Sequence, residues 1–130
     1  MPTLLVIDDN QSVRDILQMV LSRRGYTVFV AESGGAAIAL CAEHAIDGAI
    51  VDVHMPGMDG LQVCRSLRNQ ASVAGRGLAV WLMTGAHTRE LAQLAAEAGA
   101  LALFKKPFDL TDLYKRLEFQ FSGESEMRRV

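Results

Sequence analysis

Several residues have side chains whose types and positions suggest chemistry, and each stands at or just after the end of an apolar run: Asp8, Asp9, Asp52, Thr84 and the pair Lys105 and Lys106. Asp8 and Asp9 are adjacent, and neighbouring carboxylates repel each other, so a cation is expected near them. Together with Asp52 they offer only oxygen ligands, which suit a hard divalent cation. Mg²⁺ typically takes one or two carboxylates, water and a phosphate oxygen. The set therefore predicts a Mg²⁺ site with a hydroxyl and one or two ammonium groups beside it.

Short apolar runs alternate with helical patterns along the whole chain, and the runs predict five strands: residues 3–7, 27–31, 48–52, 78–84 and 100–104. The clearest amphipathic helix has its apolar residues at the i, i+3, i+4, i+7, i+8 spacing: Val13, Ile16, Leu17, Val20 and Leu21. Five strands that alternate with five helices predict an α/β protein with a parallel sheet covered on both faces. In such a sheet functional residues gather at the carboxyl ends of the strands, so the polar residues should share one rim.

Residues suited to helix ends and sheet edges support this arrangement. Gly25 stands where the first helix would need a left-handed residue after its C-terminus. Ser33, Asp59 and Thr88 precede the second, third and fourth helical patterns and are suitable N-caps. The strand at 27–31 leads to no candidate functional residue, so it is expected at an edge of the sheet.

Each of the polar residues also has an ordinary structural explanation when it is taken alone. An Asp-Asp-Asn sequence between a strand and a helix is a common helix cap. Asp52 can simply end a strand, a threonine at a strand end is usually structural, and a lysine before proline is usually solvated. All of these explanations would have to hold together on four strands of one sheet, so we favour a shared functional site.

Several motifs of this sequence, at their mutual spacing, resemble the receiver domain of two-component response regulators (CheY-like). The motifs are DD at 8–9, VDVHMPGMDG at 51–60, TG at 84–85, AGA at 98–100 and KPF at 106–108. The resemblance runs from Thr3 to about Phe121 and implies an α/β, flavodoxin-like (βα)5 three-layer sandwich. Its five-stranded parallel sheet would have the order 2-1-3-4-5. The chain would then comprise a receiver domain, residues 1–121, and a polar C-terminal tail or linker start, residues 122–130.

The resemblance also implies roles for the candidate residues. The Mg²⁺ ligands that it implies are Asp8, Asp9, Asp52 and the backbone carbonyl of His54. Asp52 is the implied phosphoacceptor, and Thr84 and Lys106 are expected to contact the phosphoryl oxygens. Lys106, rather than Lys105, is the matching lysine because it directly precedes Pro107, and the family implies a cis bond between those two residues.

The function that the resemblance implies is that of a switch. A histidine kinase or histidine phosphotransfer protein would donate the phosphoryl group, and the changed surface would be read by a downstream protein target or output domain. Such a domain is not an enzyme, although it has limited autophosphorylation and autodephosphorylation activity.

Two positions depart from the family pattern, and the first is Leu103. The position three before the matching lysine usually holds an aromatic ring that turns inward on activation. Phe104 cannot replace that ring directly, because adjacent strand residues point to opposite faces. We expect the aromatic half of the usual threonine–aromatic coupling to be weak or absent, and we favour a permanently packed Leu103.

The second departure is His54, two residues after Asp52, together with Ala86, two residues after Thr84. These side chains should flank the path by which water reaches the phosphoryl group. A histidine can donate or accept a hydrogen bond near neutral pH, so His54 could orient that water. The alternative is an exposed loop histidine without effect.

Phe119 falls opposite the apolar stripe of the last helix at 100° per residue. In this family the face built from the fourth helix, the fifth strand and the fifth helix commonly meets partners or a second copy. We hypothesise that Phe119 contributes to such an interface, which includes a homodimer, against the alternative of a frayed helix end.

The composition limits other function classes. A formal net charge of -2, with 22% charged residues, indicates no basic stripe for direct nucleic-acid binding. The first apolar run meets charge after five residues, too few for a signal peptide or membrane span, so we expect no membrane contact and a cytoplasmic location. Cys41 and Cys64 lack metal-ligand spacing and are expected as reduced thiols in or near the core.

The strongest alternative function is a Mg²⁺-dependent aspartyl-phosphate phosphohydrolase. Many such enzymes place a second carboxylate two residues after the nucleophile, but Asn10 follows Asp8 and His54 follows Asp52 at that spacing. A dinucleotide-binding Rossmann unit is disfavoured, because the first strand–helix turn, DDNQS, is acidic and lacks glycine.

Overall fold

The computed structural model describes residues 2–107 and 109–129, and it describes their side chains as far as residue 122. A five-stranded parallel sheet with strand order β2-β1-β3-β6-β7 forms its centre. The strands are β1 (Thr3–Ile7), β2 (Thr27–Ala31), β3 (Gly48–Asp52), β6 (Ala79–Thr84) and β7 (Ala102–Lys105). Counted within the sheet, this is the expected order 2-1-3-4-5, with the second strand at an edge.

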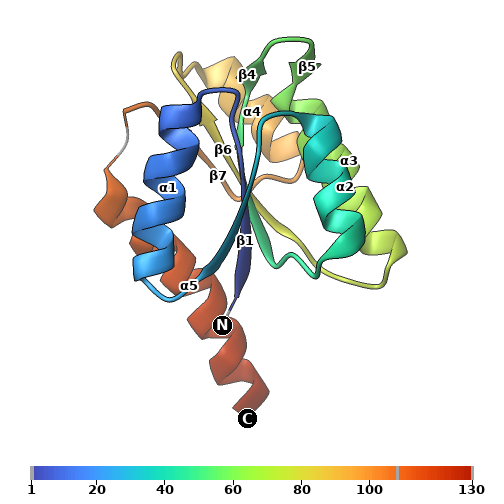
Figure 1. Cartoon of the computed structure of the whole chain (residues 1–130), viewed down its shortest axis with the longest axis vertical. Coiled ribbons are helices and arrows are strands. Elements are labelled where there is room, and N and C mark those ends of the chain that lie inside the picture. The colour runs from blue at the N-terminus through green and yellow to red at the C-terminus, as the bar shows by residue number, and fades with distance from the viewer. Residues whose placement is uncertain (1, 108, 130) are drawn as a thin grey trace.

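Five helices cover the two faces of the sheet: α1 (Gln11–Arg23), α2 (Gly34–Glu43), α3 (Gly60–Val73), α4 (Arg89–Glu97) and α5 (Leu110–Arg129). Figure 1 shows α1 and α5 on one face, and α2 and α3 on the other. Ala95 of α4 packs in the same apolar cluster as Val63 and Leu67 of α3. The arrangement is the three-layer α/β sandwich that the sequence predicts.

Strand residues alternate between two separate cores, one on each face. Along β1, Leu4 and Val6 join the core under α1 and α5, whereas Leu5 and Ile7 join the core under α2, α3 and α4. Successive strand side chains point to opposite faces, which produces this division. Every residue of β3 is buried, because a central strand of a doubly covered sheet meets helices on both sides. A slip in register would exchange the two faces, so burial holds the end of β3 in place.

The residues expected at helix ends occupy those positions. Three predicted N-cap side chains accept hydrogen bonds from N–H groups in the first turn: Ser33 from Ala36, Asp59 from Leu61 and Thr88 from Leu91. Gly25 follows α1 with φ of +97°, in the left-handed region that favours glycine. Asn10 caps α1 by accepting from the N–H groups of Ser12 and Val13. The helix-cap explanation of Asp-Asp-Asn therefore holds for its third residue.

A small hairpin between β3 and α3 was not predicted from the sequence. Strand β4 (His54–Met55) pairs antiparallel with β5 (Met58–Asp59), and Pro56 and Gly57 form the turn. Gly57 has φ of +74°, which suits glycine at the third position of a type II turn after proline. The Pro-Gly signal was present, but strands of two residues are too short to show alternation.

Helix α5 continues to Arg129, past the point near residue 121 where the receiver domain was expected to end. The division into 1–121 and 122–130 stays a prediction. No helix in the described part of the chain is long and apolar enough to cross a membrane. Cys41 and Cys64 are both free thiols, the first partly buried and the second buried, as predicted. Phe108, the last residue of the KPF motif, lies outside the described residues.

Candidate functional site

The candidate residues meet at one edge of the sheet, where the strands end. Asp8 and Asp9 follow β1, Asp52 ends β3, Thr84 ends β6 and Lys106 follows β7. The strand order reverses between β1 and β3, and ligands in open α/β sheets bind at such a switch point. Asp8, Asp52 and Thr84 are almost fully buried, with exposed fractions of 0%, 5% and 0%.

Asp8, Asp9 and Asp52 form an acidic cluster in which one carboxylate oxygen from each residue lies within 4.8 Å of the others. Mg²⁺ contacts its oxygen ligands at about 2.0–2.1 Å, so opposite ligands lie about 4 Å apart. Two local hydrogen bonds hold Asp8 in place. The Asn10 N–H donates to Asp8 Oδ1 at 2.9 Å, and the Arg14 side chain donates to the Asp8 backbone carbonyl at 2.8 Å. Donor type and spacing both fit a Mg²⁺ ion.

The ammonium group of Lys106 lies against this cluster. Its Nζ is 2.7 Å from Asp8 Oδ2 and 3.4 Å from Asp52 Oδ2. Burial by itself lowers the pKa of Lys106, but the hydrogen bond to Asp8 and the charges of Asp8 and Asp52 outweigh it and raise that pKa. Three carboxylates against one ammonium leave an excess of two negative charges. Lys106 therefore neutralises part of the negative charge of the cluster, and a divalent cation would neutralise the remainder.

Asp52 lies in a partly unfavourable environment. Burial, and after it the charge of Asp8, raise the pKa of the Asp52 carboxyl group, and the groups that lower it do not cancel this effect. Those groups are the His54 N–H, which donates to Asp52 Oδ1 at 3.2 Å, and Lys106. Such a carboxylate gains from any further positive charge placed beside it.

The close approach of α3 to the end of β3 depends on Gly60. Its N–H donates to the Val53 carbonyl at 2.9 Å. A Cβ atom at Gly60 would collide with the Asp52 carbonyl oxygen and with Val53 Cα. Because Gly60 has no side chain, this first residue of α3 can lie directly against the end of β3, immediately after the N-cap residue Asp59.

The hydroxyl of Thr84 has three polar neighbours. The Ala86 N–H donates to Thr84 Oγ1 at 3.1 Å, and Oγ1 lies 3.3 Å from the Ala86 carbonyl oxygen. The third neighbour is His54 Nε2, at 3.1 Å. The spacing along the chain predicts that His54 and Ala86 flank the path of water to the phosphoryl group, but it does not predict that either contacts Thr84. His54 is exposed, as the alternative expects, but its ring contacts Thr84, and its suggested role with water stays a prediction.

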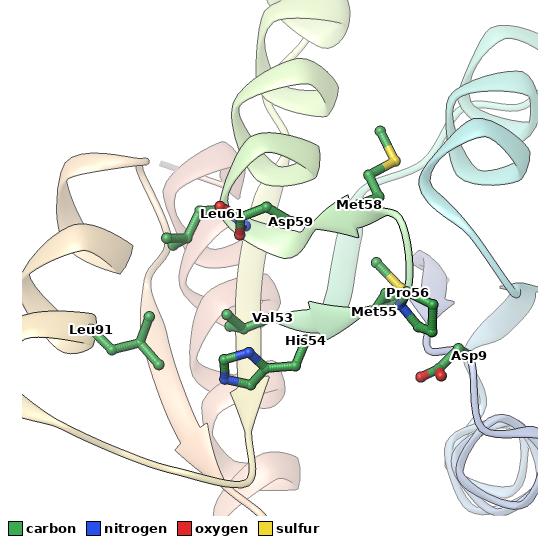
Figure 2. A pocket seen from close by; sticks show the side chains of 9 residues that line it. All are labelled: Asp9, Val53, His54, Met55, Pro56, Met58, Asp59, Leu61 and Leu91. Atoms are coloured by element: carbon green, nitrogen blue, oxygen red, sulfur yellow. Dashed lines mark hydrogen bonds between the residues drawn. The ribbon is translucent and has the colours of Figure 1, made fainter.

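A pocket of about 720 Å³ opens beside the β4–β5 hairpin and α4. Figure 2 shows the His54 ring directed away from Asp9 and toward the side of the pocket where Leu91 of α4 lies. The ring therefore faces Thr84 rather than the acidic cluster, while the His54 backbone N–H reaches Asp52.

Two further predictions, one for Leu103 of β7 and one for the Lys106–Pro107 bond after it, agree with the structure. Leu103 is partly buried against the core under α2, α3 and α4, whereas Phe104 is buried in the opposite core. The bond between Lys106 and Pro107 is cis, as the resemblance implies. The weak threonine–aromatic coupling stays a prediction. Phe119 is 82% exposed, as its helical position predicts, and its place in an interface also stays a prediction.

This fold and this rim of acidic, hydroxyl and ammonium groups agree with a known class of signalling protein. A family model described as the response regulator receiver domain matches residues 4–118, and the chain belongs to this family. It is similar to the response regulator MprA of Mycobacterium sp. (strain KMS), with 37% identity over 114 residues that cover 88% of this chain and 48% of that protein. MprA of Mycobacterium avium is 36% identical over the same shares of the two chains. The chain thus spans about half the length of the curated relatives it matches.

Solved structures agree with this family membership. The chemotaxis protein CheY4 of Vibrio cholerae superposes with a TM-score of 0.82 and 30% identity, over 91% of this chain and 97% of that chain. The response regulator TrrA of Thermotoga maritima, solved in complex with Mg(2+)-BeF, superposes with a TM-score of 0.77 and 27% identity, over 91% and 97%. The chain is a receiver domain of the CheY-like type.

Proposed function

We propose that this chain accepts a phosphoryl group on Asp52 from a histidine kinase or a histidine phosphotransfer protein. Mg²⁺ would be held by Asp8, Asp9, Asp52 and the backbone carbonyl of His54. The observation that carries the proposal is that three carboxylates and the Lys106 ammonium group converge at the edge of the sheet where the strands end. The Mg(2+)-BeF complex of the similar protein TrrA supports the same chemistry for this site.

The transfer requires little covalent help from the protein. An Asp52 carboxylate oxygen attacks phosphorus and forms a P–O bond, while the bond from phosphorus to the donor breaks. The donor's electron pair leaves with its nitrogen in phosphohistidine, or with its acyl oxygen in acetyl phosphate, and the product is an aspartyl phosphate. Phosphoryl transfer depends mainly on positioning and charge neutralisation, which are what this site supplies.

Two cations would neutralise charge during the transfer. Mg²⁺ held by Asp8, Asp9, Asp52 and the backbone carbonyl of His54 would act as a Lewis acid and neutralise charge on the cluster and on the transferred group. Lys106 supplies the second charge, since its Nζ lies 3.4 Å from Asp52 Oδ2 and so within reach of an oxygen added there. Thr84 ends the neighbouring strand β6, paired in register beside the end of β3, and its hydroxyl can donate to a phosphoryl oxygen.

Phosphorylation would change the surface of the protein through its charge. An aspartyl phosphate adds strong acceptor oxygens and about one to two negative charges. Thr84 leads directly into the loop before α4, so a shift of Thr84 would alter the face built from α4, β7 and α5. The readers of that face would be a downstream protein target, an output domain or a second copy of the chain. In this role the chain is a switch with limited autophosphorylation and autodephosphorylation activity.

The phosphohydrolase alternative has less support. The two positions at which such an enzyme would need its acid/base carboxylate hold Asn10 and His54. The side chain of Asn10 caps α1, and the ring of His54 contacts Thr84, so both have other partners.

The test is to incubate the protein with Mg²⁺ and acetyl phosphate and to record its intact mass beside that of Asp52→Asn. We expect one acid-stable, base-labile phosphoryl group that requires both Mg²⁺ and Asp52. If no adduct appears, a beryllofluoride titration separates rapid hydrolysis from an inactive site. Binding of beryllofluoride with Mg²⁺ would indicate rapid hydrolysis, whereas the absence of binding would overturn the proposed function.

A further inference from the structure

One contact of the site has no part in the transfer itself, namely that between the His54 ring and the Thr84 hydroxyl. We propose that His54 is a positioning residue that holds Thr84 in the resting arrangement and so opposes the arrangement that binds the phosphoryl group. This inference rests on the proposed function of the site and adds a determinant of its regulation.

The hydrogen-bonding capacity of the Thr84 hydroxyl is used within its own surroundings. A hydroxyl has one proton to donate and two lone pairs to accept with. The Ala86 N–H occupies one lone pair, at 3.1 Å. The hydroxyl proton then goes either to the Ala86 carbonyl or to His54 Nε2, depending on the histidine tautomer. If His54 Nε2 carries a hydrogen, the ring donates to the second lone pair of the hydroxyl. If Nε2 carries none, the ring accepts the hydrogen bond that the hydroxyl donates.

Phosphorylation requires a different use of the same hydroxyl. The Lys106 N–H donates to the Thr84 carbonyl at 2.7 Å, but among the described residues no hydrogen bond joins the Thr84 hydroxyl to Asp52 or to the Lys106 ammonium group. To donate to a phosphoryl oxygen on Asp52, the Thr84 hydroxyl must break the hydrogen bond to its present acceptor, and a shift of the hydroxyl oxygen toward Asp52 would also break its contact with the His54 ring. Thr84 is 0% exposed, so water cannot readily take the place of the contact that is lost. The His54 contact therefore adds to the cost of the phosphorylated arrangement.

The backbone holds His54 firmly enough to act in this way. The Val53 N–H donates to the Met83 carbonyl at 2.8 Å, and the Gly60 N–H donates to the Val53 carbonyl at 2.9 Å. On the next residue, the His54 N–H donates to Asp52 Oδ1. His54 thus contacts the phosphoacceptor through its backbone and Thr84 through its ring, and links the two residues that must rearrange together.

The side chain is not placed as a metal ligand. Figure 2 shows the ring pointing away from Asp9, with the hairpin between them. A role of His54 in orienting water, which its place in the sequence suggests, would change the lifetime of the aspartyl phosphate. The positioning role instead changes an equilibrium that involves no hydrolysis, so different measurements detect the two roles.

The experiment measures the affinity of the Mg²⁺-saturated protein for beryllofluoride by isothermal titration calorimetry. His54→Leu removes the polar ring atoms, and His54→Gln restores a polar group at similar reach. His87→Leu is the matched control, since His87 is an exposed histidine in the loop after Thr84. We expect His54→Leu to bind beryllofluoride about twofold to tenfold more tightly, the range for one hydrogen bond of ordinary net strength. His54→Gln should return toward the wild-type affinity, and His87→Leu should equal it.

A double-mutant cycle assigns the effect to the Thr84 hydroxyl. Thr84→Val removes that hydroxyl and keeps a branched side chain, and in this background His54→Leu should no longer change the affinity. An equal effect of His54→Leu in both backgrounds would overturn the inference, as would weaker binding or unchanged binding by the single variant. Circular dichroism confirms that each variant is folded, and the exposed His54 makes unfolding of His54→Leu unexpected.

The two proposals fail in different ways. If wild type does not bind beryllofluoride with Mg²⁺, the proposed function fails, and the inference fails with it. If wild type binds and His54→Leu binds no more tightly, the proposed function stands and only the inference is overturned.

Discussion

Replacing Asp52 by asparagine should make the metal-free protein more stable, although Asp52 is the centre of the proposed function. The Asp52 carboxylate lies within 4.8 Å of the carboxylates of Asp8 and Asp9, and Lys106 Nζ is 3.4 Å away. With an effective dielectric constant of about 20, like charges 4.8 Å apart repel by about 3.5 kcal/mol, and opposite charges 3.4 Å apart attract by about 5 kcal/mol.

The two repulsions together exceed the attraction by about 2 kcal/mol. Solvent reduces the contribution of the exposed Asp9, whereas burial of a charged Asp52 adds to the cost. Asparagine keeps an acceptor for the His54 N–H and removes the charge. We therefore expect Asp52→Asn to raise the free energy of unfolding by about 1–2 kcal/mol at neutral pH in EDTA.

Urea unfolding measures this difference, with the fluorescence of the single tryptophan, Trp81, as the signal; its side chain is buried at 2% exposure. The dependence of the unfolding free energy on urea should be the same for both proteins, because they expose the same surface on unfolding. Asp15→Asn, at an exposed carboxylate on α1, is the control and should change little. Mg²⁺ at 100 times its Kd should stabilise wild type by about 2.7 kcal/mol and the Asp52→Asn variant by less.

The pH dependence tests the cause. Because the pKa of Asp52 is raised in the folded state, the folded protein binds this proton more readily than the unfolded chain does. Wild type therefore gains stability as the pH falls through the raised pKa of Asp52, and its deficit against Asp52→Asn closes there. At neutral pH the deficit is fully present. A variant that is less stable than wild type in EDTA at neutral pH would show that the Lys106 contact outweighs the repulsion, and would refute the reasoning.

Three further predictions follow from single side chains. Gly60→Ala should lower the free energy of unfolding by about 1–3 kcal/mol, because the added Cβ meets backbone atoms. The control Gly35→Ala, on α2, adds a Cβ that meets nothing within 4 Å and should raise the free energy of unfolding by up to about 1 kcal/mol. Urea unfolding measures both differences. Lys106→Met should leave the buried Asp8 unpaired and cost about 1–3 kcal/mol at neutral pH. That wild-type advantage should be lost as the pH rises through the raised pKa of Lys106, and equal slopes of stability against alkaline pH in both proteins would contradict it. Phe119→Ala should weaken self-association or partner binding in sedimentation velocity with beryllofluoride, and no change in either would remove Phe119 from the interface.

Local patterns predicted the secondary structure closely, because near neighbours decide it. Strands β1, β2 and β3 begin and end at the predicted residues. β7 begins two residues later than predicted, since the Ala100 N–H still bonds back to Ala95 of α4. The missed β4–β5 hairpin is too short for alternation to reveal, and only its Pro-Gly turn pointed to it. The helix caps succeeded because a cap needs contact over only two or three residues.

The sequence by itself also determined which residues share the rim, because in a parallel sheet every carboxyl strand end lies on the same edge. It did not determine how they pair there. Lys106 lies closest to Asp8 rather than to Asp52, a contact across 98 positions of the chain, and His54 meets Thr84 across 30. Such pairs depend on strand order, on the turn of the β4–β5 hairpin and on which side chains remain unsolvated once the cores close. Spacing along the chain encodes none of these, so only the tertiary structure decided which charge and which ring each functional group meets.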